Sequence, residues 1–145
     1  MFLAKSFTAA ALALTLSLPA LPALAGGHQI WIEQWGANNQ VGGGQTGYGQ
    51  RLSVYQDGTS NISINTQDGR RNSAAIGQSG TDNLVDTHQC GRRNQVGVGQ
   101  FGHGNEAVMT QCGRRNVAAV VQVGNNNDAS VSQHGSNNVV AIVQE

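Results

Sequence analysis

Cys90 and Cys112 carry the most reactive side chains of this 145-residue chain, and they are its two cysteines. Each lies inside a copy of the same segment, Gln-Cys-Gly-Arg-Arg-Asn, which the sequence contains twice. A pair of thiols can form a disulfide or stay free, whereas a metal site needs further ligands close by. The chemistry open to this pair depends on whether the fold brings the two copies of the segment together.

Two glycine-rich segments, 42–47 and 97–102, have the Gly-x-Gly-x-x-Gly spacing found in dinucleotide-binding loops. That spacing indicates a phosphate site when it lies between a strand and a helix, with an acidic residue about 20 positions further on. Neither segment leads into a helical pattern, and no Gly-x-Ser-x-Gly motif or converging set of Ser, His and Asp marks a hydrolase. The sequence therefore predicts no catalytic residue, no cofactor and no enzyme.

An 11-residue repeat runs through most of the chain and sets these spacings. Glutamine recurs at every eleventh position from Gln34 to Gln144, and glycine follows it two residues later ten times. Asparagine follows five residues later, with the single exception of Gln50. The unit reads Gln-x-Gly-x-x-Asn-x-[Ala/Val]-x-[Val/Ile]-x, which we number 1 to 11 from its glutamine. A fixed short period is typical of architectures in which each unit packs on its neighbours.

The pattern inside each unit predicts one strand and one turn. From asparagine to the next glutamine the apolar and amide residues alternate with period two, which is typical of a strand with one buried face. The glycine-containing segment between strands predicts a tight turn, because glycine adopts positive φ readily. Two successive units bring the chain back above its start. We therefore expect an all-β fold: a two-sheet β-solenoid, or cross-β arcade, of five 22-residue coils.

Three segments are expected along the chain. Residues 1–25 combine Lys5, an apolar run and an Ala-Leu-Ala cleavage site, as in a secretory signal peptide. Residues 26–33 form a short segment in which Ile30 and Ile32 fit a preceding half-coil, and residues 34–145 form the solenoid domain. The apolar run is too short to span a bilayer, so we expect export and no membrane span.

The two sheets are expected to enclose small apolar side chains together with amides. Alanine, valine, leucine and isoleucine predominate at positions 8 and 10, and the amides at positions 1 and 6 share their inward face. A buried amide is costly unless it is paired, but identical amides one coil apart can hydrogen-bond in a column. The expected assembly columns contain Gln34, Asn39, Gln45, Gln56, Asn61, Gln67, Asn72, Gln78, Asn83, Gln89, Asn94, Gln100, Asn105, Gln111, Asn116, Gln122, Asn127, Gln133, Asn138 and Gln144. An end coil leaves its strand edge and amides open, so the pattern predicts recruitment of further copies of the same chain.

Stacked coils would place the Cα atoms of Cys90 and Cys112 about 4.8 Å apart, within the range of about 4.4 to 6.8 Å that disulfides show. Parallel side chains would hold the Cβ atoms slightly too far apart for an unstrained bridge. A disulfide and two free surface thiols therefore both remain open.

The four histidines fall at different unit positions, which predicts separate surface sites and no metal centre: His28, His88, His103 and His134.

A basic edge is expected where the three Gly-Arg-Arg-Asn turns stack: Arg70, Arg71, Arg92, Arg93, Arg114 and Arg115. Like charges opposite each other cost about 0.2 to 1 kcal/mol per pair, so something must offset them. One interpretation is a stripe that binds polyanions such as extracellular DNA or lipopolysaccharide. The other is that the charge slows premature assembly during export.

The repeat resembles the curlin repeat, Ser-x5-Gln-x-Gly-x-x-Asn-x-Ala-x3-Gln. Gln78–Asn83 and Gln122–Ala129, the latter followed by Gln133, are closely similar to it. The resemblance implies a subunit of curli, the extracellular amyloid fibres that bacteria export through the periplasm and an outer-membrane pore. It also implies roles in adhesion and biofilm matrix.

The same resemblance implies three kinds of partner: other copies of the chain, a second curlin subunit and the curli export machinery. It implies that inward glutamines and asparagines of terminal repeats drive polymerisation. Two roles stay open within the family, the building block of the fibre and the minor subunit that nucleates its growth at the cell surface. From the residues alone, a monomeric secreted solenoid that binds polyanions is a further alternative.

Overall fold

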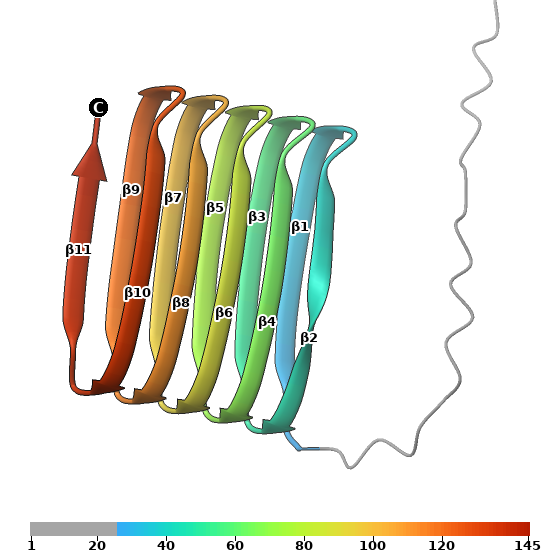
Figure 1. Cartoon of the computed structure of the whole chain (residues 1–145). Coiled ribbons are helices and arrows are strands. Elements are labelled where there is room, and N and C mark those ends of the chain that lie inside the picture. Colours follow the sequence, from blue (N-terminus) through green and yellow to red (C-terminus); the bar gives the residue numbers. More distant parts are fainter. Residues whose placement is uncertain (1–25) are drawn as a thin grey trace, which may run out of the picture.

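The computed structural model describes residues 26–145, which fold as a stack of β-strands (Figure 1). The strands are β1 (Gln29–Ala37), β2 (Gln40–Tyr48), β3 (Arg51–Thr59), β4 (Ile62–Arg70), β5 (Ser73–Thr81), β6 (Leu84–Arg92), β7 (Gln95–His103), β8 (Glu106–Arg114), β9 (Val117–Asn125), β10 (Asp128–Ser136) and β11 (Val139–Gln144). The predicted signal peptide, residues 1–25, lies outside the described residues. None of the described residues belongs to a helix that could span a membrane.

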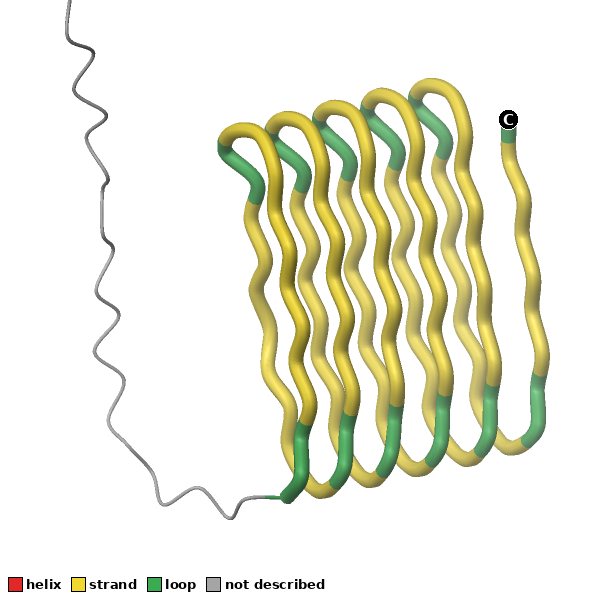
Figure 2. Tube along the Cα trace, turned by 180° about the vertical axis from the view of Figure 1, so that it is seen from behind, coloured by secondary structure: helices red, strands yellow, loops and turns green. Residues whose placement is uncertain are grey.

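Successive strands alternate between two parallel sheets (Figures 1 and 2). One sheet has six strands in the order β1-β3-β5-β7-β9-β11, and the other has five in the order β10-β8-β6-β4-β2. Each strand pairs in register with the strand one coil further along the chain, as Gln56 lies opposite Gln78. The predicted all-β solenoid with 22-residue coils is confirmed.

The turns are shorter than the sequence predicts. Between β4 and β5 only Arg71 and Asn72, at positions 5 and 6 of the unit, lie outside the strands. The glycine at position 3 belongs to the strand, and Gly80 has a φ of 120°. A Cβ atom on Gly80 would lie 2.0 Å from the carbonyl oxygen of Gly102 in the next coil. Glycine is therefore required both for its positive φ and for the close approach of stacked backbones.

The core lies between the two sheets and follows the period-two pattern. In β3, Leu52, Val54 and Gln56 are buried, while the residues between them are exposed. The buried apolar side chains form one cluster: Leu52, Val54, Ala74, Ile76, Val85, Val96, Val98, Ala107, Met109, Ala118, Val120, Ala129 and Val131. The apolar residues at positions 8 and 10 of successive units thus join the coils along the stack.

A small polar group interrupts this core where the unit carries Ser63, Asn65 and Thr87 at apolar positions. Asn65 Nδ2 donates to Ser63 Oγ at 2.8 Å, and Thr87 Oγ1 donates to Asn65 Oδ1 at 2.7 Å. The hydrogen bonds offset the cost of burying these three polar side chains. The departure from the apolar pattern is therefore compatible with the same fold.

Candidate functional site

Two columns of glutamine side chains run along the inside of the stack. In each column the Nε2 of one glutamine donates to the Oε1 of the glutamine one coil later. The distances are 2.6 to 3.0 Å in the column Gln34, Gln56, Gln78, Gln100, Gln122 and Gln144. They are 2.6 to 3.2 Å in the column Gln45, Gln67, Gln89, Gln111 and Gln133. Every bond of both columns is therefore donated in the same direction along the stack.

The amides inside the stack are satisfied only because coils lie on both sides of them. Gln100 is fully buried; its Nε2 donates to Gln122 Oε1 at 2.8 Å and to the carbonyl of Leu84 at 2.9 Å. Its Oε1 accepts from Gln78 Nε2 at 2.9 Å. Leaving a buried polar group unpaired costs about 1 to 3 kcal/mol. The columns thus make each coil depend on its neighbours.

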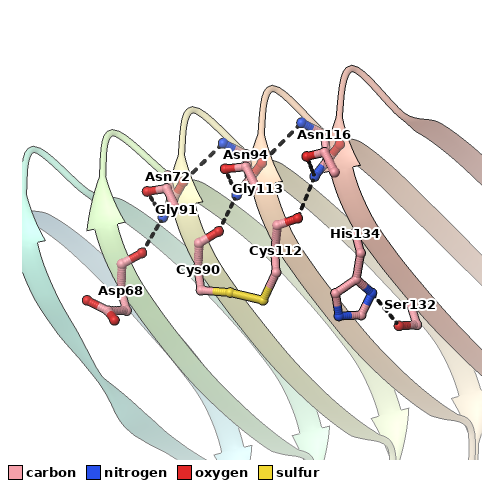
Figure 3. Close-up of a disulfide and its surroundings, with 11 residues drawn as sticks. Asp68, Asn72, Cys90, Gly91, Asn94, Cys112, Gly113, Asn116, Ser132 and His134 are labelled. Carbon is pink, nitrogen blue, oxygen red and sulfur yellow. Dashed lines mark hydrogen bonds between the residues drawn. A yellow bond between two sulfur atoms is a disulfide. The ribbon is translucent and has the colours of Figure 1, made fainter.

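The asparagines at position 6 also stack in columns, but they connect the coils differently (Figure 3). The backbone N–H of Asn94 donates to Asn72 Oδ1 at 3.0 Å. Asn94 Nδ2 donates to the carbonyl of Cys90 at 2.8 Å, four residues earlier. The asparagines therefore hold the turns and join them mainly through backbone groups. Direct bonds between asparagine side chains are found from Asn61 Nδ2 to Asn39 Oδ1 at 3.2 Å and from Asn83 Nδ2 to Asn61 Oδ1 at 3.0 Å.

Gln50 replaces the asparagine of one unit and is less well satisfied. Its Nε2 donates to the carbonyls of Thr46 and Gln67, whereas its buried Oε1 has no partner among the described residues. The longer side chain cannot reproduce the bond that an asparagine Oδ1 accepts from the next coil. The asparagine column is therefore interrupted at this position, near the N-terminal end of the stack.

The two ends of the glutamine columns present opposite groups. At the N-terminal end, Gln45 Oε1 is buried and has no partner among the described residues. At the C-terminal end, Gln133 Nε2 and Gln144 Nε2 donate only to the backbone carbonyls of Val117 and Asp128, at 3.1 and 3.0 Å. The N-terminal end therefore presents an acceptor without a donor, and the C-terminal end presents donors without a glutamine acceptor.

The end coils also leave core residues uncovered. Ile30 and Ile32 of β1 occupy the inward positions, yet 59% and 47% of their surfaces are exposed. Leu52, which lies opposite Ile30 in the next coil, is only 7% exposed. At the other end, Val140 and Ile142 of β11 are only partly buried. Apolar area and strand edges are therefore open at both ends of the stack.

Cys90 in β6 and Cys112 in β8 are joined by a disulfide across two coils (Figure 3). They lie opposite each other in the parallel pairing, and their Cα atoms are 4.6 Å apart. Of the two outcomes that the sequence left open, the structure has the disulfide. The neighbouring coils carry Asp68 and His134 at the same unit position: Asp68 lies opposite Cys90, and His134 lies opposite Cys112.

One histidine, His88, lies beside the disulfide. The nearest donor atoms of His88, Cys90 and Cys112 all lie within 4.8 Å of one another. His88 and Cys90 share a face because the strand continues past Gln89, where the sequence predicts a turn. Both sulfur atoms are used in the disulfide, so they are not available as thiolate ligands.

Opening the disulfide is expected to destabilise the solenoid. The bridge closes a loop with a sequence separation of 22, and restricting such a loop in the unfolded chain contributes about 2 to 4 kcal/mol. Urea unfolding of the soluble chain with and without a reductant measures this loss. The variant Cys90→Ser/Cys112→Ser should unfold as the reduced chain does and show no response to the reductant. An identical midpoint for oxidised and reduced chain would contradict the prediction.

The six arginines of the basic edge lie together, as the spacing of the turns predicts, and all are exposed: Arg70, Arg71, Arg92, Arg93, Arg114 and Arg115. They line a groove of about 460 Å³ together with Tyr48, which the repeat pattern does not indicate. Tyr48 pairs in register with Arg70, so it extends the arginine row by one coil. The groove runs along the turns that lead from one sheet to the other.

Comparison with known proteins gives one family. The model of the curlin-associated repeat matches residues 80–113, 109–135 and 124–145. No match was found among curated proteins. The matched segments carry the part of both glutamine columns from Gln89 onward, together with the glycines and asparagines of the same coils. The chain is a curlin-repeat protein.

Proposed function

We propose that this chain is the structural subunit of an extracellular curli-type amyloid fibre, in which copies stack end to end through their open coils. The observation that carries the proposal is the complementarity of the two ends. One end offers the unpaired Oε1 of Gln45, and the other offers Nε2 groups of Gln133 and Gln144 that lack a glutamine acceptor. A second copy placed head to tail would continue both glutamine columns.

The backbone at the ends supports the same stacking. The N–H of Val117 donates to the carbonyl of Asn138 in the following coil at 2.8 Å. Val139 lies opposite Val117 in β11, so its N–H is directed away from β9 toward the open edge. An uncovered edge strand is a template for another strand, and here it also has parallel pairing and matching side chains in every coil.

Stacking would also cover the apolar end residues. Ile30 and Ile32 at one end and Val140 and Ile142 at the other would become buried as the residues of the inner coils are. Burial of apolar area stabilises an interface by about 25 cal/mol per Å².

We further propose that residues 1–25 direct export and that residues 34–145 form the fibre module. The fibre would serve in adhesion and in the biofilm matrix at the cell surface.

Fibre growth by the purified chain tests this function. Incubated without its signal segment, the chain should form fibres with reflections at about 4.8 Å along the axis and about 10 Å across it. A permanently monomeric chain under these conditions would overturn the proposal.

A mixture of the chain with a second curlin subunit separates two roles. If the chain is a nucleator, it should shorten the lag phase of the second subunit. If the chain is the building block, it should show a lag phase of its own, and seeds of the second subunit should abolish that lag phase.

A proline on the open edge is expected to slow growth without unfolding the solenoid. Ala141 lies two residues after Val139 in β11, so its N–H also points away from β9. The variant Ala141→Pro removes this N–H, and we expect elongation from preformed seeds to slow at least about tenfold, because the edge can no longer pair. The control Ala141→Thr keeps the N–H. Equal elongation rates for the two variants would exclude β11 as a growing edge.

A further inference from the structure

The basic edge is built from three turns that stack in register. Arg70, Arg92 and Arg114 end β4, β6 and β8 and lie opposite one another. The turns are also joined by backbone bonds, since the N–H of Arg93 donates to the carbonyl of Arg70 at 2.9 Å. The arginine side chains are therefore fixed at their bases in two rows, with a rise of about 4.8 Å per coil.

The second row of arginines occupies a backbone conformation that disfavours it. Arg71, Arg93 and Arg115 have φ angles of 57°, 59° and 55°, in the left-handed region where residues with a Cβ are unfavourable. The other turns have short or flexible residues at this position: Asn38, Gly49, Ser60, Asp82, Gly104, Asn126 and Asn137. The fold therefore does not require arginine there, and three copies are present despite the conformational cost.

The described part of the chain gives these arginines no acidic partner. Between residues 26 and 145 a single ion pair is found, His103 with Asp82 at 3.6 Å. Both of those residues belong to the opposite edge. Six exposed guanidinium groups thus share one groove without an internal counter-charge. Stacked like charges repel one another, and a bound anion would offset this repulsion.

We propose that this groove binds a flexible chain of phosphodiesters, that is, single-stranded nucleic acid. Arginine presents a planar fork of donors that matches phosphate oxygens, whereas lysine presents a point charge. The described residues contain no lysine at all. A tetrahedral phosphate can accept from guanidinium groups of two adjacent coils at once, and the ring of Tyr48 at one end of the groove can stack on a base.

The shape of the groove favours a single strand over a duplex. The arginine rows are straight and span two coil steps, about 10 Å. The phosphates of a duplex are fixed on a helix with a rise of about 3.4 Å per nucleotide along each strand, and they wind away from a straight stripe. A flexible strand can adjust its phosphates to the coil spacing. The carboxylates of an acidic polysaccharide are planar and suit one guanidinium fork rather than a pair of forks.

Binding to one copy is sufficient, so the test does not depend on fibre formation. Fluorescence anisotropy of a labelled oligothymidine of about 15 nucleotides, with the soluble full-length mature chain, measures the dissociation constant at several salt concentrations. If three phosphates are contacted, each by two guanidinium groups, the logarithm of the association constant should fall with the logarithm of salt concentration with a slope of about −2. A duplex and a polyuronate of similar length are measured alongside.

The variant Arg71→Asn/Arg93→Asn/Arg115→Asn tests the groove while preserving the fold, because asparagine already occupies this turn position in Asn38, Asn126 and Asn137. We expect the affinity to fall at least about tenfold and the slope to become shallower, since half of the guanidinium groups that contact the strand are lost.

The control Thr59→Glu/Thr81→Glu/Asn125→Glu changes the net charge by the same amount at the opposite edge. Its affinity should fall less than about threefold at physiological salt, because exposed charges at that distance are largely screened. Equal losses for the two variants would show that net charge, rather than the groove, binds the strand, and would overturn the proposal. Absence of binding at low salt, or tighter arginine-dependent binding of the duplex or the polyuronate, would also overturn it. Circular dichroism confirms that each variant keeps its β-structure.

Discussion

Gly80→Ala is expected to destabilise the solenoid by about 3 to 5 kcal/mol, from left-handed strain together with steric overlap. The added Cβ would lie 2.0 Å from the carbonyl oxygen of Gly102. That oxygen belongs to the backbone of the next coil, so it cannot move aside as a side chain would. Relief requires that two coils separate, which breaks the glutamine bonds between them. Urea unfolding and amide hydrogen exchange of β5 and β7 measure the effect.

Gly77 provides the matched control in the same strand. It has an ordinary φ, and nothing lies within 4 Å of a Cβ built on it. Gly77→Ala should therefore be neutral or stabilise the chain by about 0.4 to 1 kcal/mol, because alanine reduces the entropy of the unfolded chain. If Gly80→Ala were as mild as Gly77→Ala, the coils would not stack at the distance described.

Gln100→Ala should be of similar severity, at about 3 to 5 kcal/mol, since it combines a cavity with lost hydrogen bonds. The substitution leaves Gln78 Nε2, Gln122 Oε1 and the carbonyl of Leu84 with one bond fewer each. These groups lie in the interior between the sheets, where water cannot easily replace the missing amide. The free energy of unfolding and the exchange rates of the neighbouring coils report the loss.

Gln95→Ala is the control for the column, because Gln95 is in the same strand β7 but exposed. The free energy of unfolding should change by no more than about 0.5 kcal/mol. A similar loss for both variants would mean that strand propensity, not the buried amide, explains the result. A small loss for both would mean that the columns contribute little to the stability of the stack.

Much of the fold could be predicted from the sequence, because the repeat has a single period that never slips. One 11-residue unit sets one strand and one turn, and the alternation from Asn61 to Gln67 sets which face is buried. Parallel pairing between alternate units follows directly. The arginine rows and the proximity of Cys90 and Cys112 follow from the same register.

Features that depend on side-chain direction could not be predicted in this way. The repeat gives Gln78 and Gln100 the same position but does not determine which of them donates. It does not show that Tyr48 reaches the arginine groove. The pattern does not indicate the proximity of His88 to Cys90, because it places the glycine with positive φ in the turn, whereas Gly91 remains within the paired strand β6.

The uniform direction of the glutamine bonds has an electrical consequence. Each amide group carries a dipole, and dipoles aligned in series add, as they do along a helix. The two columns, from Gln34 to Gln144 and from Gln45 to Gln133, would therefore give a head-to-tail fibre a net dipole along its axis. Fibres grown from one surface in one direction would form a polar array with a net dipole, whereas the dipoles of a mixture of opposed fibres would cancel.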